Sequence, residues 1–187
     1  MFRCGSPVTA EYSMLPRANR ERSRRDISKL KLNGRSAEIQ RLIGRALRSV
    51  VDMKKLGPWN ITIDCDVLQG DGGTRTASVT GGFIALALAC RKLVEEGWIA
   101  ENPIRHYVTG ISAGIVDDTA VLDLQYYEDS RAQVDLNCVM NEQGEIIELQ
   151  GTGEGRAFTM EEQQELVRLC AKGNKELLKI QKEILEG

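Results

Sequence analysis

The amino-acid sequence predicts an α+β fold, and three of its features carry that prediction. Residues 61–67 alternate apolar and polar side chains with a period of two, which is typical of a strand with one buried face. Apolar residues between Ile39 and Val51 recur at helical spacing, so that stretch predicts an amphipathic helix. After residue 107, strand-like segments follow one another without a helix between them. Such an order favours a sheet that is covered by helices.

The first third of the chain combines two strands, a basic segment and a helix. The weak alternation before Pro16 predicts a strand, and the residues after it lack helical periodicity. Ser36 stands where an N-cap belongs, and Gly57-Pro58 is a typical helix end. The predicted elements are a strand at 8–15, an extended basic loop at 17–35, a helix from Ser36 to Gly57 and a strand at 61–67.

The rest of the chain predicts one long helix, two hairpins and two terminal helices. Asp117-Asp118 and Gln143-Gly144 are typical hairpin turns. Thr159 and Glu162 have the spacing of a capping box at a helix start. The predicted elements are a helix at 76–96, strands at 108–116, 120–126, 136–141 and 145–150, and helices at 159–172 and from Asn174 onward.

Composition sets the class of protein. The chain has 187 residues, of which 42% are hydrophobic and 28% charged, as in ordinary globular proteins. Its length predicts a single domain over residues 1–187. No apolar run approaches the roughly 18 residues of a membrane span and no secretory leader is recognisable, so we expect a cytoplasmic protein without a membrane partner. Five scattered cysteines and one histidine form no zinc, redox or triad pattern, which leaves carboxylates and a hard ion such as magnesium for any metal chemistry.

The net charge of −2 conceals two parts of opposite sign. Residues 1–58 contain 14 Lys and Arg against 5 Asp and Glu, whereas residues 59–187 contain 11 against 22. Eight basic residues lie between Arg17 and Arg35, and six of them are arginines, which bind phosphate through paired hydrogen bonds. Charge runs are often only solvated loops, but the scarcity of balancing acids favours contact with an RNA or DNA backbone. No helix-turn-helix or zinc pattern supports a dedicated DNA-binding module.

A glycine-rich segment, Gly72-Gly73-Thr74-Arg75-Thr76, stands between a predicted strand and a predicted helix. Glycines let backbone N–H groups surround an anion, and a helix N-terminus adds partial positive charge. Arg75 can add a bidentate contact to phosphate oxygens. An ordinary strand-to-helix turn with a threonine N-cap explains the same residues equally well, and the segment is not a Walker loop.

Two pairs of acids are candidates for metal or acid chemistry. Asp129 follows one predicted strand and Asp135 precedes the next, so a short connection could bring both carboxylates to one place. Such a pair suits magnesium or general acid catalysis, although two acids in a surface loop are the common alternative. Asp64 and Asp66 lie on the polar face of the strand at 61–67, and we interpret them as structural.

Several stretches of the sequence together resemble the ribonuclease PH family. They are VTAEYSMLPR at 8–17, GRSAEIQRLIGR at 34–45, DCDVLQ at 64–69, DGGTRTAS at 71–78, and Glu128-Asp129 with Asp135, Asn137, Val139 and Met140. The resemblance implies the ribosomal protein S5 domain 2-like α+β fold, assembled as a homohexamer of three dimers. It implies a phosphate-dependent 3′→5′ exoribonuclease, a tRNA nucleotidyltransferase that trims tRNA precursors, rRNA and other RNA and releases nucleoside diphosphates. Inorganic phosphate would be the co-substrate and Mg²⁺ the cofactor.

The resemblance also implies roles for single residues. Phosphate binding falls to Arg35, Gly73, Thr74 and Arg75, catalysis and magnesium binding to Asp129 and Asp135, and binding of the RNA 3′ end to Arg17, Arg22 and Arg25. Family members carry roughly fifty further residues before the segment that begins at Val8, so we expect a chain shortened at its N-terminus that lacks the first strands of the fold. The alternative function is therefore a catalytically inactive RNA-binding or ring-scaffold subunit of the same family.

Overall fold

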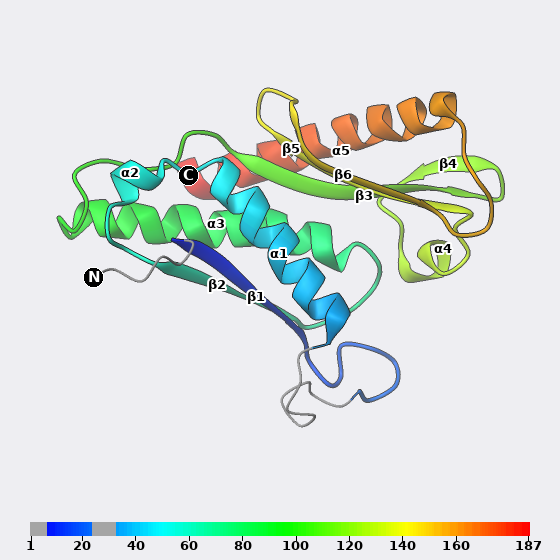
Figure 1. The fold of residues 1–187 in the computed structure, drawn as a ribbon, viewed down its shortest axis with the longest axis horizontal. Coiled ribbons are helices and arrows are strands. Elements are labelled where there is room, and N and C mark those ends of the chain that lie inside the picture. Colours follow the sequence, from blue (N-terminus) through cyan, green and yellow to red (C-terminus); the bar gives the residue numbers. More distant parts are fainter. Residues whose placement is uncertain (1–6, 24–32) are drawn as a thin grey trace.

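The computed structural model describes residues 7–23 and 33–187, which form two sheets and two layers of helices (Figure 1). The elements are β1 (Val8–Met14), α1 (Gly34–Ser49), α2 (Met53–Leu56), β2 (Ile61–Val67), α3 (Thr74–Glu95), β3 (Val108–Val116), β4 (Thr119–Leu122), α4 (Tyr126–Asp129), β5 (Val134–Asn141), β6 (Ile146–Gly153) and α5 (Met160–Glu186). The predicted α+β class is confirmed.

The layers alternate between sheet and helix. β1 and β2 pair in parallel from Val8↔Ile61 to Met14↔Val67, and α1 forms the crossover between them. The second sheet is antiparallel with the order β4-β3-β5-β6. α1 and α3 lie between the two sheets, and α5 covers the opposite face of the larger sheet (Figure 1). Because β1 and β2 are parallel, their carboxyl ends lie at one edge, where the loops after them meet.

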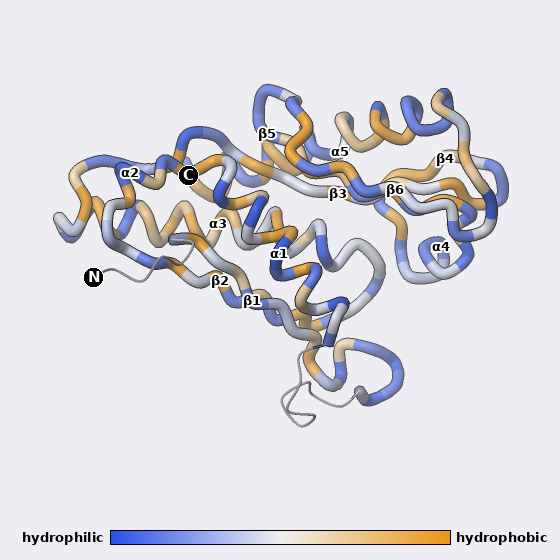
Figure 2. Tube along the Cα trace, in the orientation of Figure 1, coloured by the Kyte–Doolittle hydropathy of each residue, from blue (hydrophilic) through white to orange (hydrophobic). Residues whose placement is uncertain are grey.

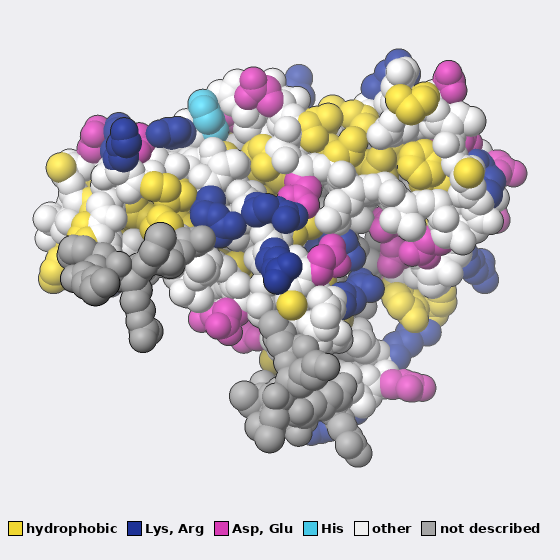
Figure 3. Space-filling view, viewed as in Figure 1, with side chains coloured by type: hydrophobic (Ala, Val, Ile, Leu, Met, Phe, Trp, Pro, Cys, Tyr) yellow, Lys and Arg dark blue, Asp and Glu magenta, His cyan; other side chains and the backbone are white. Residues whose placement is uncertain are grey.

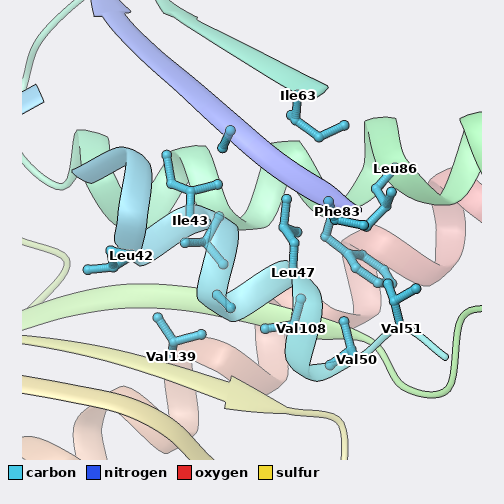
Figure 4. Close-up of a cluster of buried hydrophobic side chains, with 14 of the residues drawn as sticks. Leu42, Ile43, Leu47, Val50, Val51, Ile63, Phe83, Leu86, Val108 and Val139 are labelled. Carbon is cyan, nitrogen blue, oxygen red and sulfur yellow. The ribbon is translucent and has the colours of Figure 1, made fainter. Parts of the chain in front are cut away.

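Two hydrophobic clusters hold these layers together. The larger one fills the space around α1 and α3, and Figure 4 shows Leu47 and Phe83 among its side chains. The smaller one lies between the antiparallel sheet and α5. β5 serves both clusters, since Val139 faces α1 and α3 while its neighbour Cys138 faces α5. The period-two alternation of β5 therefore places Asp135 and Asn137 on the same face as Val139.

Replacing Ile43 with Val is expected to lower the free energy of unfolding by about 0.5–1.5 kcal/mol. Ile43 is fully buried in the larger cluster, so loss of one methylene leaves a void that the neighbours fill only partly. Urea unfolding of both proteins would measure the difference. Ile146→Val at the exposed start of β6 is the matched control and should change the free energy by no more than about 0.5 kcal/mol. Equal effects of the two variants would contradict this assignment of the core.

The predicted strand at 120–126 is too long. β4 ends at Leu122, and Asp123 has a φ of 58°, a left-handed conformation that stops the strand. The chain then makes one helical turn, α4, because Gln125 and Glu128 form a reciprocal capping box. The hairpin turn at Asp117-Asp118 suggested a strand as far as Tyr126, but these local side-chain hydrogen bonds determine the structure.

The two predicted terminal helices are one continuous helix, α5. The expected break at Gly173-Asn174 is wrong, because both residues are buried within the helix. A Cβ on Gly173 would lie 2.6 Å from Cδ1 of Ile111, so the glycine allows close packing of α5 on β3 rather than ending the helix. Conversely, the single helix predicted from Ser36 to Gly57 is α1 plus the short α2, and the N-cap of α1 is Asn33 rather than Ser36. Asp52 separates them by accepting hydrogen bonds from the N–H groups of Lys54 and Lys55.

Within the described residues, α3 is the one helix long and apolar enough, by length and composition alone, to cross a membrane. The sequence expectation that no such stretch exists therefore needs this correction. Buried side chains of α3, among them Val79, Phe83 and Leu86, belong to the larger hydrophobic cluster. α3 also packs against β2, β3 and α5, so we interpret it as a core helix.

Candidate active site

A cavity of about 300 Å³ lies where the loops after β1 and β2 meet the N-termini of α1 and α3 and the start of β5. Its lining includes every residue predicted to bind phosphate and both predicted acids: Arg35, Gly73, Thr74, Arg75, Asp129 and Asp135. These residues come from segments that lie far apart in the sequence. The fold therefore assembles one pocket with a basic side and an acidic side.

The glycine turn and the N-terminus of α3 form the base of this pocket. Gly72 has a φ of 78°, and a Cβ there would lie 2.1 Å from the carbonyl oxygen of Leu124, so only glycine fits. Gly73 is the N-cap of α3, and no side chain caps its first turn. The predicted alternative of a threonine N-cap is therefore wrong, and the helix begins at Thr74 rather than Thr76. Uncapped N–H groups at the end of a 22-residue helix favour an anion.

Neighbouring side chains hold Thr74 and Arg75 in place. Nη1 of Arg75 donates to Oε1 of Gln150 at 2.9 Å and lies 3.5 Å from Oε1 of Glu38. Both contacts use Nη1, so Nε and Nη2 can form a bidentate pair with a phosphate. The hydroxyls of Thr74 and Tyr12 are 2.8 Å apart. Arg75 has a side chain only 19% exposed, which places its charge in a poorly solvated pocket where it acts strongly on an anion.

The acidic side of the pocket is the pair Asp129 and Asp135, at the end of α4 and the start of β5. Burial raises the pKa of Asp135, and the nearby charge of Asp129 raises it further. A hydrogen bond of 3.0 Å from Nδ2 of Asn137 to Oδ2 of Asp135, together with the charge of Arg75, partly opposes this rise in pKa. The described residues contain no cluster of three or more His, Cys, Asp or Glu with metal-binding geometry. Two carboxylates still fit Mg²⁺, which commonly uses one or two carboxylates together with substrate phosphates and water.

Ser112 is a pocket residue that sequence reasoning missed. Its side chain lines the cavity and is only 3% exposed, and its Oγ has no hydrogen-bond partner in the described structure. An unsatisfied buried hydroxyl is costly, and an anion bound in the pocket would satisfy it. Ser112 pairs with Asn137 across β3 and β5, which puts it on the same face as Asp135. The available sequence signal was a serine at a position of β3 that faces the helices between the sheets.

The other predicted residues lie outside this pocket. Arg17 and Arg22 line a neighbouring cavity of about 970 Å³, and Arg25 lies outside the described residues. Asp64 and Asp66 are exposed on β2 and line a separate groove beside α3, so they are not part of the acid pair.

Two arginines of α1, Arg45 and Arg48, have partners within the protein. Figure 3 shows Lys and Arg side chains gathered over this helix, on the face opposite its buried residues. Arg45 forms a salt bridge of 2.5 Å with Glu148, and Arg48 donates to the carbonyl oxygen of Val8 at 2.8 Å. These contacts connect α1 to β6 and β1, so they support the fold rather than an anion site.

The fold and the pocket define an α+β protein that is built to hold an anion beside two carboxylates. Residues 2–92 match domain 1 of the 3′ exoribonuclease family, and residues 106–173 match domain 2. A ribonuclease PH from Syntrophomonas wolfei subsp. wolfei is 54% identical over 178 residues, which are 95% of this chain and 74% of that protein. The chain therefore belongs to the ribonuclease PH family of 3′ exoribonucleases.

A solved structure supports the fold independently. The crystal structure of Rrp46 from rice (Oryza sativa) superposes on this structure with a TM-score of 0.75. The matched region covers all of this chain and 78% of the Rrp46 chain. Its sequence is only 13% identical, so the similarity bears on the fold alone. The predicted ribosomal protein S5 domain 2-like fold is confirmed, because Rrp46 has it and the matched family domains agree.

Proposed function

We propose that this chain is a phosphate-dependent 3′→5′ exoribonuclease, a tRNA nucleotidyltransferase that trims RNA 3′ ends and releases nucleoside diphosphates. The observation that carries the proposal is the single pocket in which Arg35, Arg75 and the N-terminus of α3 face Asp129 and Asp135. The similarity to a protein named ribonuclease PH supports the same activity. The alternative of an inactive scaffold subunit is not favoured, because the predicted phosphate and acid residues are all present and assembled.

The basic side of the pocket binds the co-substrate. Inorganic phosphate lies against the N–H groups of Gly73 and Thr74, with Arg75 and Arg35 neutralising its charge. Ser112 donates its otherwise unpaired hydroxyl to the same anion. The N–H groups of the helix N-terminus and Arg75 are fixed before the phosphate arrives, so these donors need little reorganisation during the reaction.

The acidic side of the pocket acts on the RNA end. An oxygen of the phosphate attacks the phosphorus of the last phosphodiester, the bond from that phosphorus to the 3′ oxygen of the preceding nucleotide breaks, and a nucleoside diphosphate leaves. The shortened RNA needs a proton on its 3′ oxygen. Asp135, whose pKa is raised, and the attacking hydrogen phosphate are the two acids in the pocket that can supply it.

Mg²⁺ belongs to the same proposal. Asp129 and Asp135 would hold the ion, which would neutralise charge on the transferring phosphoryl group. The raised pKa of Asp135 reflects its burial and the repulsion by Asp129, a cost that a bound divalent cation relieves. Positioning and electrostatics then perform the catalysis, so the reaction needs no nucleophilic side chain.

The direct test is phosphorolysis of a tRNA with a 3′ extension, using Mg²⁺ and radiolabelled inorganic phosphate. We expect labelled nucleoside diphosphate and progressive shortening of the RNA, and no shortening when phosphate is left out. A folded protein that produces no labelled nucleoside diphosphate would contradict the proposed function. Release of nucleoside monophosphates without phosphate would instead indicate a hydrolytic nuclease.

Ser112→Ala is expected to raise the KM for phosphate about tenfold or more, because a hydrogen bond to a charged group contributes about 1.5–3 kcal/mol. The fold should not be weakened, since the substitution removes a buried hydroxyl that has no partner in the protein. Steady-state rates at varied phosphate would measure the effect. Ser49→Ala on α1, which is outside the pocket, is the matched control. An unchanged KM for phosphate in Ser112→Ala would remove Ser112 from the site.

We further propose that the chain assembles as a homohexamer of three dimers and works in the cytoplasm, as the family resemblance implies. Ile180 and Ile184, one turn apart on α5, are each about half exposed. Large apolar side chains grouped at a surface are typical of interfaces. Light scattering of the purified protein would give its mass, and a monomer at all concentrations would contradict the assembly.

A further inference from the structure

A second cavity, of about 970 Å³, opens beside the candidate active site. Its walls are residues 17–23 after β1, residues 68–71 after β2 and the start of α4. It shares Asn19, Gly70 and Tyr126 with the active-site cavity, so the two cavities are adjacent. Figure 2 shows that the loop after β1 and α4, which line this second cavity, are largely hydrophilic in sequence. Two aromatic residues, Tyr126 and Tyr127, also line this cavity.

Tyr126 and Tyr127 are each 50% exposed, with ring centroids 6.1 Å apart. Their exposure does not come from a loose loop. The turn that carries them is closed by the capping box of Gln125 and Glu128, and the N–H of Tyr126 donates to Oδ1 of Asp71 at 3.3 Å. A fixed backbone thus presents two aromatic rings, inclined at 65° to each other, to the cavity.

The charge of this cavity favours a polyanion. Arg17, Arg20 and Arg22 line it and outnumber its two acids, Glu21 and Asp71. The guanidinium of Arg20 lies 4.7 Å from the ring centroid of Tyr127. Such a contact shows that the face of Tyr127 already accepts a flat, cationic group. A single-stranded nucleic acid matches both the arginines and the tyrosines of this cavity. The arginines attract its phosphates, and the tyrosine rings stack on its bases.

We propose that Tyr126 and Tyr127 form a stacking platform for the bases at the single-stranded 3′ end of the RNA. The inference rests on the proposed function, which places the last phosphodiester in the neighbouring pocket. Tyr126 lines both cavities, so it contacts the base of the terminal nucleotide. Tyr127 lines only the outer cavity and contacts a base further upstream. Because every base has a π-face, the platform holds unpaired 3′ ends with little preference for sequence and does not hold a blunt duplex, whose bases are already stacked.

The test measures RNA binding without turnover. A fluorescently labelled single-stranded RNA is titrated with protein in the absence of phosphate, and anisotropy gives the Kd. We expect Tyr127→Ala to weaken binding about 5- to 150-fold, the range measured for loss of one base–aromatic stack, and Tyr127→Phe to restore most of it. Trp98→Ala, which removes an aromatic residue of similar exposure outside both cavities, should leave the Kd unchanged.

A second arm changes the RNA instead of the protein. An abasic nucleotide near the 3′ end should weaken binding to the unaltered protein. The abasic RNA should then bind Tyr127→Ala almost as well as it binds the unaltered protein, because the base that would stack on Tyr127 is missing. In phosphorolysis, Tyr127→Ala should raise the KM for RNA with kcat retained. Tyr126→Ala should lower kcat as well, since the terminal nucleotide is then misplaced.

The outcomes separate this inference from the proposed function. A Kd that is unchanged in Tyr126→Ala and Tyr127→Ala, or that rises equally in Tyr127→Phe and Tyr127→Ala, would overturn the platform even if the protein degrades RNA. Equal losses with abasic and complete RNA would overturn it too. A protein that binds as described but produces no nucleoside diphosphate would keep the platform and overturn the activity.

Discussion

Arg75→Ala is expected to lower kcat/KM for phosphorolysis about 10²–10³-fold, the usual cost of removing one fixed donor from a site where charge is stabilised. Arg75 is held by Gln150 and Glu38, so its guanidinium is positioned before the phosphate binds. The loss should divide between a higher KM for phosphate and a lower kcat. The Kd for RNA, measured without phosphate, should change little, because the RNA surface lies in the neighbouring cavity.

Two further variants make the Arg75 result specific. Arg75→Lys keeps the charge but cannot form two parallel hydrogen bonds, so it should recover only part of the activity. Arg168→Ala on the exposed surface of α5 removes a charge of the same sign outside both cavities, and its activity should equal that of the unaltered protein. A phosphate dependence that is unaltered in Arg75→Ala would show that the anion binds elsewhere.

The parts of the site that the sequence predicts are those encoded by local patterns. Gly72-Gly73 predicts a turn because a left-handed backbone needs glycine, and the structure shows both residues with positive φ. Arg75 follows within the first turn of α3, so it necessarily lies near the same helix N-terminus. Asp129 and Asp135 flank one short connection, which keeps their separation small in any fold. The joining of these two groups into one pocket came from the family resemblance and not from the pattern.

Residues that depend on sheet register or on distant packing were missed. Gln150, which fixes Arg75, becomes a neighbour only because β6 pairs with β5 so that Gln150 is opposite Asn137. Ser112 enters the pocket through the pairing of β3 with β5. A single sequence carries no information about which strands pair. The same reason explains Gly173, where a glycine that is typical of a helix end instead allows α5 to approach β3.

The acid pair shows how stability is given up for function at this site. The carboxyl group of Asp135 is partly buried and lies near the carboxylate of Asp129. The upward shift of its pKa means that its charged form is disfavoured in the folded protein. In the metal-free protein at neutral pH this charge therefore opposes folding. An uncharged side chain of the same shape would remove the repulsion and keep the hydrogen bond from Asn137, because an amide oxygen also accepts from Nδ2.

Asp135→Asn is thus expected to have opposite effects on activity and stability. The rate constant kcat should fall about 10²–10⁴-fold, since the amide can neither transfer a proton nor offer a charged ligand to the metal, whichever of the two roles the carboxyl has. Half-maximal activity should require more Mg²⁺, because the amide oxygen binds a hard cation less strongly than a carboxylate. In the presence of EDTA the same variant should unfold at a higher urea concentration than the unaltered protein.

Asp118→Asn is the matched control for this substitution. Asp118 has an exposed side chain in the hairpin turn between β3 and β4, with a φ of 57° that asparagine tolerates well. We expect its kcat, Mg²⁺ dependence and urea midpoint to be close to those of the unaltered protein. A loss of activity in Asp135→Asn that is accompanied by a lower urea midpoint would mean that Asp135 supports the fold. Full activity of Asp135→Asn would exclude Asp135 from the reaction. Only a loss of activity together with a gain in stability fits a carboxylate that is retained for its chemistry.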